Sequence, residues 1–398
     1  MAKGRHETTP TLDKRMIIMI AAAVAGVLIA ILCVVLVVNA VTGDREPAPP
    51  ADQDPPADQD QPTDQTPDPE PDPDPDPEPD PEPDPEPDPE PEFVNPLTGL
   101  EVPEDISARR PYAIMLNNLQ KATPQEGISS ADVVYEIPVE GGVTRFMAIY
   151  QDLKGIDAVG SIRSARPYFV DIAMGYDAIY IHAGGSDDAY KRLKETGIAR
   201  LDGVNGSGDG FYRDSWRKEH MGSVHSLMFQ AGKLDSICEK NKFRMEHEDG
   251  FTTGVTFAPA DANREGQRCE TVTVRFNSSK TTSFEYNADT KLYGASQYGG
   301  AMTDSDDNAQ VKFRNIVVIS AKLTPIAGDT EGRLSAVLTG SGSGWFIADG
   351  VASEIKWMRR SATGQFTFTG QDGREIQYSP GTTYIGIIPL SSGSVEVK

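Results

Sequence analysis

Residues 160–171 read Gly-Ser-Ile-Arg-Ser-Ala-Arg-Pro-Tyr-Phe-Val-Asp, and this stretch predicts where a strand ends and a helix begins. The apolar run before the arginines has strand character. Pro167 suits the first turn of a helix, because the N–H that proline lacks would have no helical partner there. We therefore expect Arg163, Ser164 and Arg166 at a strand-to-helix corner. Helix amides and guanidinium groups both favour carboxylate or phosphate, so the corner is a candidate anion site.

The segments around this corner alternate between strand and helix patterns. Residues 186–197 begin with a serine suited to capping, continue with two acids and stop at a glycine, which is typical of a short helix. A second apolar stripe at helical spacing predicts a helix over 227–243. Mixed α/β structure is the expected class for this part of the chain, up to about residue 250. The predicted strands are Tyr112–Leu116, Val133–Val139, Thr144–Tyr150, Ala158–Ile162 and Ala178–His182.

The chain becomes mostly β after Met245–Gly250, where polar residues and a glycine interrupt the pattern. Short alternating runs separated by turns such as Asp-Gly predict a series of hairpins. We therefore expect an α/β domain over 93–250 and a mainly-β domain over 251–398. The runs are Thr271–Phe276, Ser283–Tyr286, Leu292–Tyr293, Asn315–Ile319, Gly344–Ile347, Glu354–Trp357, Gln365–Thr369, Glu375–Tyr378 and Thr383–Ile388.

Residues 16–41 contain no charged side chain and are long enough to cross a bilayer, which predicts one transmembrane helix. Lys14 and Arg15 precede this segment, so residues 1–15 are expected to be a cytoplasmic tail. The chain after this segment would then lie on the outer side of the membrane. A cleaved signal peptide is the alternative, but its apolar region is usually shorter.

Residues 44–92 form an acidic, proline-rich segment with 20 of the 60 acids, 19 of the 30 prolines and one base. This segment contributes −19 of the formal net charge of −23, so the rest of the chain is only mildly acidic. Its Pro-Asp and Pro-Glu alternation has nothing to bury and predicts an extended, disordered linker. The composition also excludes a basic surface for nucleic acid, which needs clustered lysine and arginine.

Further polar residues flank the predicted strands and complete a candidate ligand-binding site. The full set is Glu136, Glu140, Arg145, Arg163, Ser164, Arg166, His182, Arg213 and His225. These residues allow two interpretations. They form a ligand site, or the carboxylates of Glu136, Glu140 and Asp171 pair with the arginines in an internal network. His182 is either a buried core histidine or a catalytic base.

The chain lacks the sequence motifs of common hydrolases, phosphate loops and zinc sites. We expect no metal and no cofactor. Two functions remain open. One is a binding module for a cell-envelope component or an envelope protein, and the other is an envelope hydrolase that uses Ser164 or water with His182 or His225 as base. Cys238 and Cys269 lie outside the predicted membrane helix and allow at most one disulfide, whose formation the sequence leaves undecided.

Five ordered motifs stand out, namely Asn95–Leu100, Ser129–Glu136, Glu140–Phe146, Arg163–Arg166 and His182–Gly185. Together they resemble the YerB-like family of extracytoplasmic bacterial proteins, which implies that the membrane is the plasma membrane of a bacterium. The resemblance covers about residues 95–390 and implies two adjoining domains, with no established reaction. Two positions differ from the family pattern, because Ser161 and Val224-His225-Ser226 stand where the family has a proline and a Pro-His-Asn step. The predicted transmembrane helix also stands where many members carry a lipid.

Overall fold

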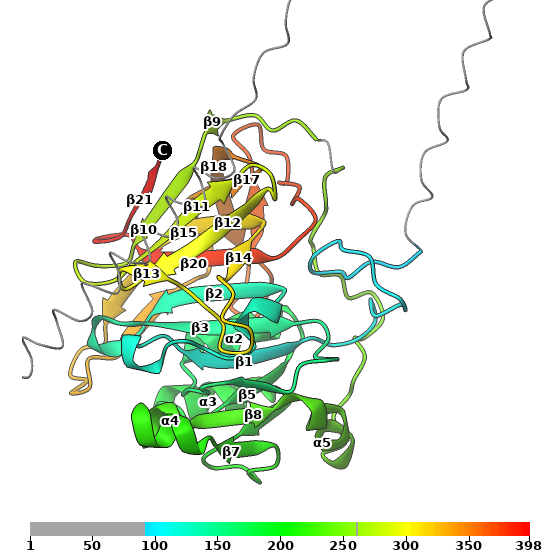
Figure 1. Cartoon of the computed structure of the whole chain (residues 1–398), viewed down its shortest axis with the longest axis vertical. Helices are drawn as coiled ribbons and strands as arrows, with labels where there is room; N and C mark the ends of the chain where they lie inside the picture. Colours follow the sequence, from blue (N-terminus) through cyan, green and yellow to red (C-terminus); the bar gives the residue numbers. More distant parts are fainter. Residues whose placement is uncertain (1–91, 260–261) are drawn as a thin grey trace, which may run out of the picture. The chain divides into compact units, whose positions relative to one another are not determined.

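A large mixed sheet of twelve strands organises the computed structural model, which describes residues 92–259 and 262–398 (Figure 1). In sheet order its strands are β19 (Thr367–Thr369), β18 (Val351–Arg359), β17 (Gly340–Ala348), β15 (Asn315–Pro325), β20 (Thr383–Pro389), β2 (Val133–Pro138), β3 (Thr144–Tyr150), β1 (Tyr112–Asn117), β5 (Ile179–His182) and β6 (Arg200–Asp202). Two further strands, β16 (Leu334–Val337) and β9 (Gln267–Arg268), pair with β15 and β18.

The sheet is continuous between the N-terminal half (residues 92–250) and the C-terminal half (251–398). Strand β2 pairs in parallel with β20, and Val133 lies opposite Thr383 in the register. The expected mixed α/β first half and mainly-β second half are confirmed, but the two halves share one sheet. The domain boundary at residue 250 stays a prediction.

Two smaller sheets and four short α-helices surround the large sheet. The six-stranded sheet contains β13 (Gly300–Ala301), β12 (Leu292–Gln297), β11 (Thr281–Asn287), β10 (Thr271–Arg275), β21 (Ser394–Val397) and β14 (Lys312–Phe313), and the three-stranded sheet contains β4 (Ala158–Gly160), β8 (Leu227–Gln230) and β7 (Phe211–Arg213). The α-helices of the described residues are α2 (Pro167–Gly175), α3 (Asp187–Thr196), α4 (Ser215–His220) and α5 (Leu234–Lys240). Single 3-10 turns are η1 (Gln120–Ala122), η2 (Ile128–Ser130), η3 (Glu140–Gly142), η4 (Ser223–His225) and η5 (Ala231–Lys233).

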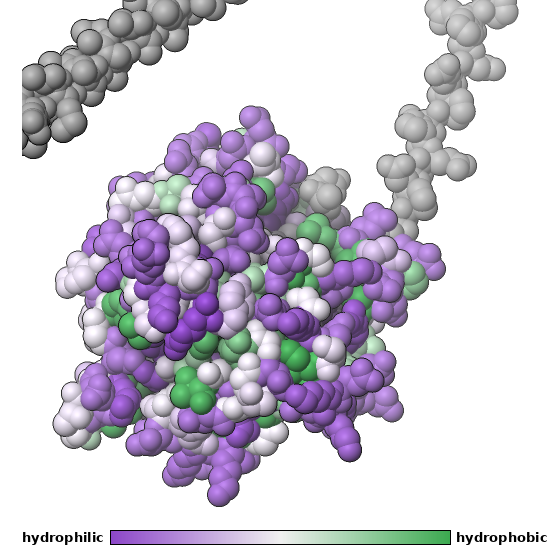
Figure 2. Space-filling view, turned by 60° about the horizontal axis from the view of Figure 1, so that its bottom comes forward, coloured by the Kyte–Doolittle hydropathy of each residue, from purple (hydrophilic) through white to green (hydrophobic). Residues whose placement is uncertain are grey.

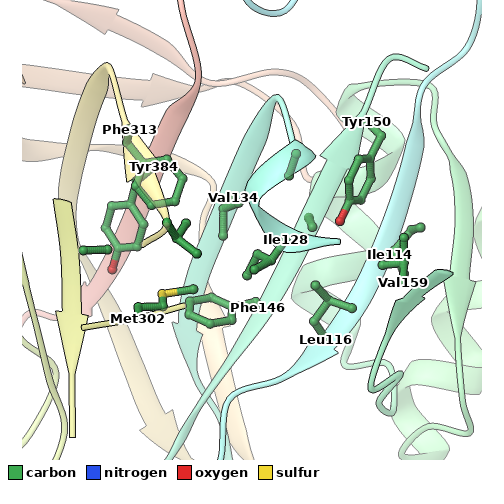
Figure 3. Packing of buried hydrophobic residues seen from close by; sticks show 14 of the residues in the cluster. Ile114, Leu116, Ile128, Val134, Phe146, Tyr150, Val159, Met302, Phe313 and Tyr384 are labelled. Carbon is green, nitrogen blue, oxygen red and sulfur yellow. The ribbon is translucent and has the colours of Figure 1, made fainter. Parts of the chain in front are cut away.

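Successive side chains of a strand point to opposite faces of the sheet. The large sheet has an apolar core on each of its two faces. On β15, Ile316 and Val318 pack in one apolar core with the six-stranded sheet, whereas Val317 packs in a second core with α2 and α3. The first core runs without a break from one half to the other (Figure 3). Figure 3 shows Tyr384 of β20, Val134 of β2, Phe146 of β3 and Leu116 of β1 in this layer.

Local signals in the sequence account for the helices near the corner. The hydroxyl of Ser186 accepts a hydrogen bond from the Ala189 N–H at 3.2 Å, and Gly197 ends α3 in the left-handed conformation, as predicted. Pro167 occupies the first turn of α2, which follows β4 as expected. The strand-to-helix corner is therefore confirmed.

Two predicted elements differ from the structure. Residues 227–243 form a strand, a 3-10 turn and a short helix in place of one helix, because Leu227–Gln230 pairs with both β4 and β7. Residues 375–378 form only isolated bridges to Thr369 and Phe257. At Leu227–Gln230, pairing with two other strands overrides the local helical pattern.

The predicted tail (1–15), the predicted membrane helix (16–41) and all of the predicted linker except Glu92 lie outside the described residues. Within residues 92–259 and 262–398, no helix has the length and hydropathy that a membrane crossing requires.

Candidate anion-binding site

The corner after β4 is held between the ends of two strands of the large sheet. The Arg163 N–H donates to Met115 O at 2.9 Å, and Arg163 O accepts from the Ala183 N–H at 3.0 Å. The Ala165 N–H donates to Gly184 O at 2.9 Å. These backbone bonds fix the positions from which the side chains of Arg163 and Arg166 extend.

Glu140 joins two of the predicted arginines. Its Oε2 accepts from Arg166 Nε at 2.9 Å, and its Oε1 accepts from Nη2 of both Arg166 and Arg145, the latter at 3.4 Å. The guanidinium groups also donate to backbone oxygens at 2.6 Å, Arg145 to Ser164 O and Arg166 to Ala165 O. Both arginine side chains are buried. This part of the arrangement matches the internal-network interpretation.

Arg163 completes the arginine cluster, which we define as Glu140, Arg145, Arg163 and Arg166. Its Nη1 donates to Val224 O at 3.2 Å, and its Nε is buried without a hydrogen-bond partner. The cluster therefore holds three guanidinium groups and one carboxylate. Two positive charges have no carboxylate of their own within it.

Burial and mutual repulsion determine the electrostatics of the cluster. Burial, followed by the positive charge of Arg166, lowers the pKa of Arg145 to about 10, although Glu140 opposes the shift. Burial also lowers the pKa of Arg163. Burial acts to raise the pKa of Glu140, but the hydrogen bond from Arg166 and the charges of both arginines outweigh it, so that pKa is lowered. A bound anion would relieve the repulsion among the arginines.

His225 belongs to the 3-10 turn η4 and lies beside Arg163. Arg213 contacts the same turn. The Asn117 side-chain amide donates to His225 Nδ1 at 2.9 Å when the ring is neutral, which places the ring proton on Nε2. Burial and the charge of Arg163 lower the pKa of His225, which favours this neutral form. Arg213 donates to Ser223 O within that turn.

His182 is fully buried and separate from the cluster in hydrogen bonding. Its Nδ1 donates to Gly184 O at 2.8 Å, and its Nε2 has no partner. Burial lowers the pKa of His182. No hydrogen bond joins the hydroxyl of Ser164 to His182 or His225 in the described residues.

Glu136 does not join the arginines. Its carboxylate is fully buried and lies 3.3 Å from the ammonium group of Lys280. Asp171 likewise pairs with Arg192 at 2.5 Å, not with a cluster arginine. The sequence offers no local signal for Lys280, since it lies in the other half of the chain.

Neither a metal site nor a disulfide is found among the described residues. No group of three or more histidine, cysteine, aspartate or glutamate side chains there is placed to hold a metal ion. Cys238 and Cys269 are both buried and free. The face in Figure 2 is mainly hydrophilic, and its apolar side chains form small separate groups. A ligand on that face would be recognised mainly by polar groups.

Two family models match the chain in the order of its halves. Residues 97–244 match "Protein of unknown function (DUF3048) N-terminal domain", and residues 272–385 match the corresponding C-terminal domain. The chain belongs to the DUF3048 family. Both DUF3048 models contribute strands to the shared sheet, because β2 lies in the first model and the second model ends inside β20, at residue 385.

A DUF3048 relative from Bacillus subtilis (strain 168) bears the name "Putative lipoprotein YerB". The two sequences are 32% identical over 305 residues, which cover 76% of this chain and 88% of the relative. A crystal structure of the YerB protein from Bacillus subtilis matches with a TM-score of 0.66 and 30% identity, and it covers 76% of this chain and 99% of that chain. The resemblance to the YerB-like family is thereby confirmed.

Proposed function

We propose that this protein is held on the outer side of a bacterial plasma membrane and binds an anionic group of an envelope component or envelope protein through the arginine cluster. The lipoprotein name of the relative supports an extracytoplasmic, membrane-anchored location. The predicted membrane helix over 16–41 and the acidic linker after it agree with that location and would hold the folded part away from the bilayer.

The charge imbalance of the cluster carries the proposal. Glu140 neutralises one of three guanidinium groups, and Arg163 keeps a buried Nε without an acceptor. A carboxylate or phosphate beside Arg163 would supply both the missing acceptor and the missing negative charge. The N-terminal end of α2 adds a favourable dipole, although Phe169 and Val170 already donate their N–H groups to Arg166 O.

The hydrolase alternative has less support. A serine nucleophile needs a histidine nitrogen within about 3.2 Å of its hydroxyl, or of the attacked group once substrate is bound. The Nδ1 atoms of His182 and His225 are engaged by Gly184 O and Asn117, and His182 Nε2 is enclosed. Binding is therefore the function that the geometry favours.

The test measures the affinity of the full-length protein for three probes: inorganic phosphate, polyglycerol phosphate and peptidoglycan muropeptides. We expect Arg163→Ala to weaken binding by about 10-fold or more, because a charged hydrogen-bond partner of the anion is lost. Arg268→Ala is the control for the loss of an arginine charge, since Arg268 is exposed, pairs with Glu270 and lies outside the candidate set. Equal affinities of wild type and Arg163→Ala for every probe would reject the anion site.

The hydrolase is tested on the same preparations. Release of products from muropeptides that is lost in Ser164→Ala, with binding retained, would favour the enzyme over the binding module. Binding without product release is the result that we expect.

A further inference from the structure

A small cavity of about 40 Å³ lies between α2 and the segment that connects β18 to β19. Its walls include Tyr135 and Tyr176 from the N-terminal half and Arg359, Phe366 and Tyr378 from the C-terminal half. The cavity is therefore built where the two halves meet. None of these residues belongs to the arginine cluster.

Arg359 is a buried cation without a carboxylate partner. It is 1% exposed, and among the described residues no carboxylate oxygen lies within 4.0 Å of its guanidinium nitrogens. Its Nε and Nη2 donate to Gly364 O and Asp171 O, each at 2.6 Å, and its guanidinium lies 4.8 Å from the centre of the Phe366 ring. Its Nη1 is buried and has no hydrogen-bond partner.

The tyrosines of the cavity add neutral donors. The hydroxyls of Tyr135 and Tyr176 lie 2.9 Å apart and share one hydrogen bond, so one hydroxyl proton of the pair is left over. The Tyr378 side chain also lines the cavity. Burial raises the pKa of Tyr176 to about 12 and the pKa values of Tyr135 and Tyr378 further, so all three hydroxyls stay protonated at neutral pH.

The cavity wall therefore combines an unpaired guanidinium N–H group with protonated tyrosine hydroxyls. The one carboxylate in its wall belongs to Glu375, an exposed residue that forms no ion pair with Arg359. A buried guanidinium without a counter-charge is costly, and a planar carboxylate fits its fork of N–H donors.

We propose that this cavity binds a small carboxylate, of the size of formate or acetate, against the guanidinium group of Arg359. The volume supports this size class, since one water needs about 10–15 Å³ by the same measure and the cavity holds roughly three such volumes. Larger anions such as a sugar phosphate do not fit within it. The site is independent of the function proposed for the arginine cluster.

The experiment follows thermal unfolding of the full-length protein in sodium acetate. Ionic strength is held constant with sodium 2-(N-morpholino)ethanesulfonate, whose anion is too large for the cavity. We expect a saturable rise of about 2–4 °C in the melting temperature, because a ligand that binds only the folded state stabilises it. A rise that is absent, or that never saturates, overturns the proposal and leaves a cavity filled by water.

Variants then assign the effect to the cavity. Arg359→Met keeps an apolar side chain over Phe366 and is expected to abolish the acetate response. If that variant does not fold, Tyr378→Phe decides, because it keeps the ring and removes one lining hydroxyl, and it should weaken acetate binding several-fold. Tyr286→Phe, a tyrosine outside the cavity wall, is the matched control and should respond like wild type.

A last comparison separates this site from the arginine cluster. Arg163→Ala should keep the full acetate response, because Arg163 does not line the cavity. Loss of the response in Arg163→Ala, with retention in Tyr378→Phe, would assign acetate to the arginine cluster and reject the cavity site.

Discussion

The carboxylate of Glu136 on β2 and the ammonium group of Lys280 just before β11 lie 3.3 Å apart, and both side chains are almost completely buried. This ion pair connects the N-terminal half to the C-terminal half inside the core. Burial lowers the pKa of Lys280, and the charge of Glu136 opposes that shift. The carboxylate also accepts hydrogen bonds from Asn118, Thr144, Thr282 and Tyr384.

We predict that Lys280→Met destabilises the protein by about 3–5 kcal/mol, because it leaves the Glu136 carboxylate buried without a counter-charge. The additional change Glu136→Gln should restore part of this loss. The free energy of unfolding from urea titrations gives both numbers.

Lys154→Met is the control for the loss of a lysine charge. Lys154 pairs with Glu104 at 3.6 Å, and their side chains are 74% and 58% exposed, so we expect a change within about 0.5 kcal/mol. A similar loss of unfolding free energy in both variants would mean that a buried lysine partner of Glu136 stabilises the protein no more than an exposed lysine does.

The arginine cluster yields a second prediction. Glu140→Gln removes its only carboxylate and leaves Arg145 and Arg166 side by side in a buried site. We expect a loss of about 3–5 kcal/mol at low salt, and a larger recovery on addition of phosphate than in wild type. Chemical unfolding with and without phosphate measures both effects.

Glu195→Gln is the matched carboxylate-to-amide change. Glu195 pairs with Arg192 on the exposed surface of α3, so this variant should change by less than about 0.5 kcal/mol and gain nothing from phosphate. If Glu140→Gln behaved in the same way, the arginines would need no counter-charge.

How far the sequence predicts this structure depends on the distance over which each signal acts. The helix α3 has its cap at Ser186 and its stop at Gly197 within a few residues of its ends, and both were predictable. The strand Leu227–Gln230 was not, because its apolar residues also fit a helix and only pairing with β4 and β7 decides between them.

The candidate site, too, was predictable only where its residues are close in the sequence. Arg163 and Arg166 are neighbours in the chain, so the corner that holds them follows from the local pattern and Pro167. Glu140, the partner of Arg166, precedes this corner by two strands, β3 and β4, and was among the expected carboxylates. The pairing of Glu136 with Lys280 was not predictable, since the sheet brings together residues with no local relation in the sequence.

The cap of α3 provides a third prediction. Ser186→Ala removes the hydroxyl that accepts from the Ala189 N–H, and we expect it to cost about 1 kcal/mol. Ser236→Ala serves as the control, because its exposed hydroxyl only donates to the backbone oxygen of Lys233, the residue before α5. Equal unfolding free energies for the two variants would show that the cap hydrogen bond does not form in solution.

Asp132 provides the fourth prediction, which concerns pH. Burial raises the pKa of its carboxyl group from 3.8 to about 6, although hydrogen bonds from the Gln151 N–H and the Asn95 amide oppose the shift. The folded state therefore binds more protons than the unfolded state between these two values. The stabilisation from this group is complete below about pH 4 and is lost as the pH rises through 6.

Asp132→Asn cannot titrate, so the difference in unfolding free energy between wild type and this variant isolates the effect of Asp132. We expect wild type to lose about 2–3 kcal/mol relative to the variant between pH 4 and pH 7, since each unit of pKa shift corresponds to about 1.4 kcal/mol. Urea titrations at pH 4, 5, 6 and 7 measure it. A difference that is constant, or that grows in favour of wild type with pH, would mean that the hydrogen bonds from Gln151 and Asn95 outweigh burial and keep the carboxylate charged.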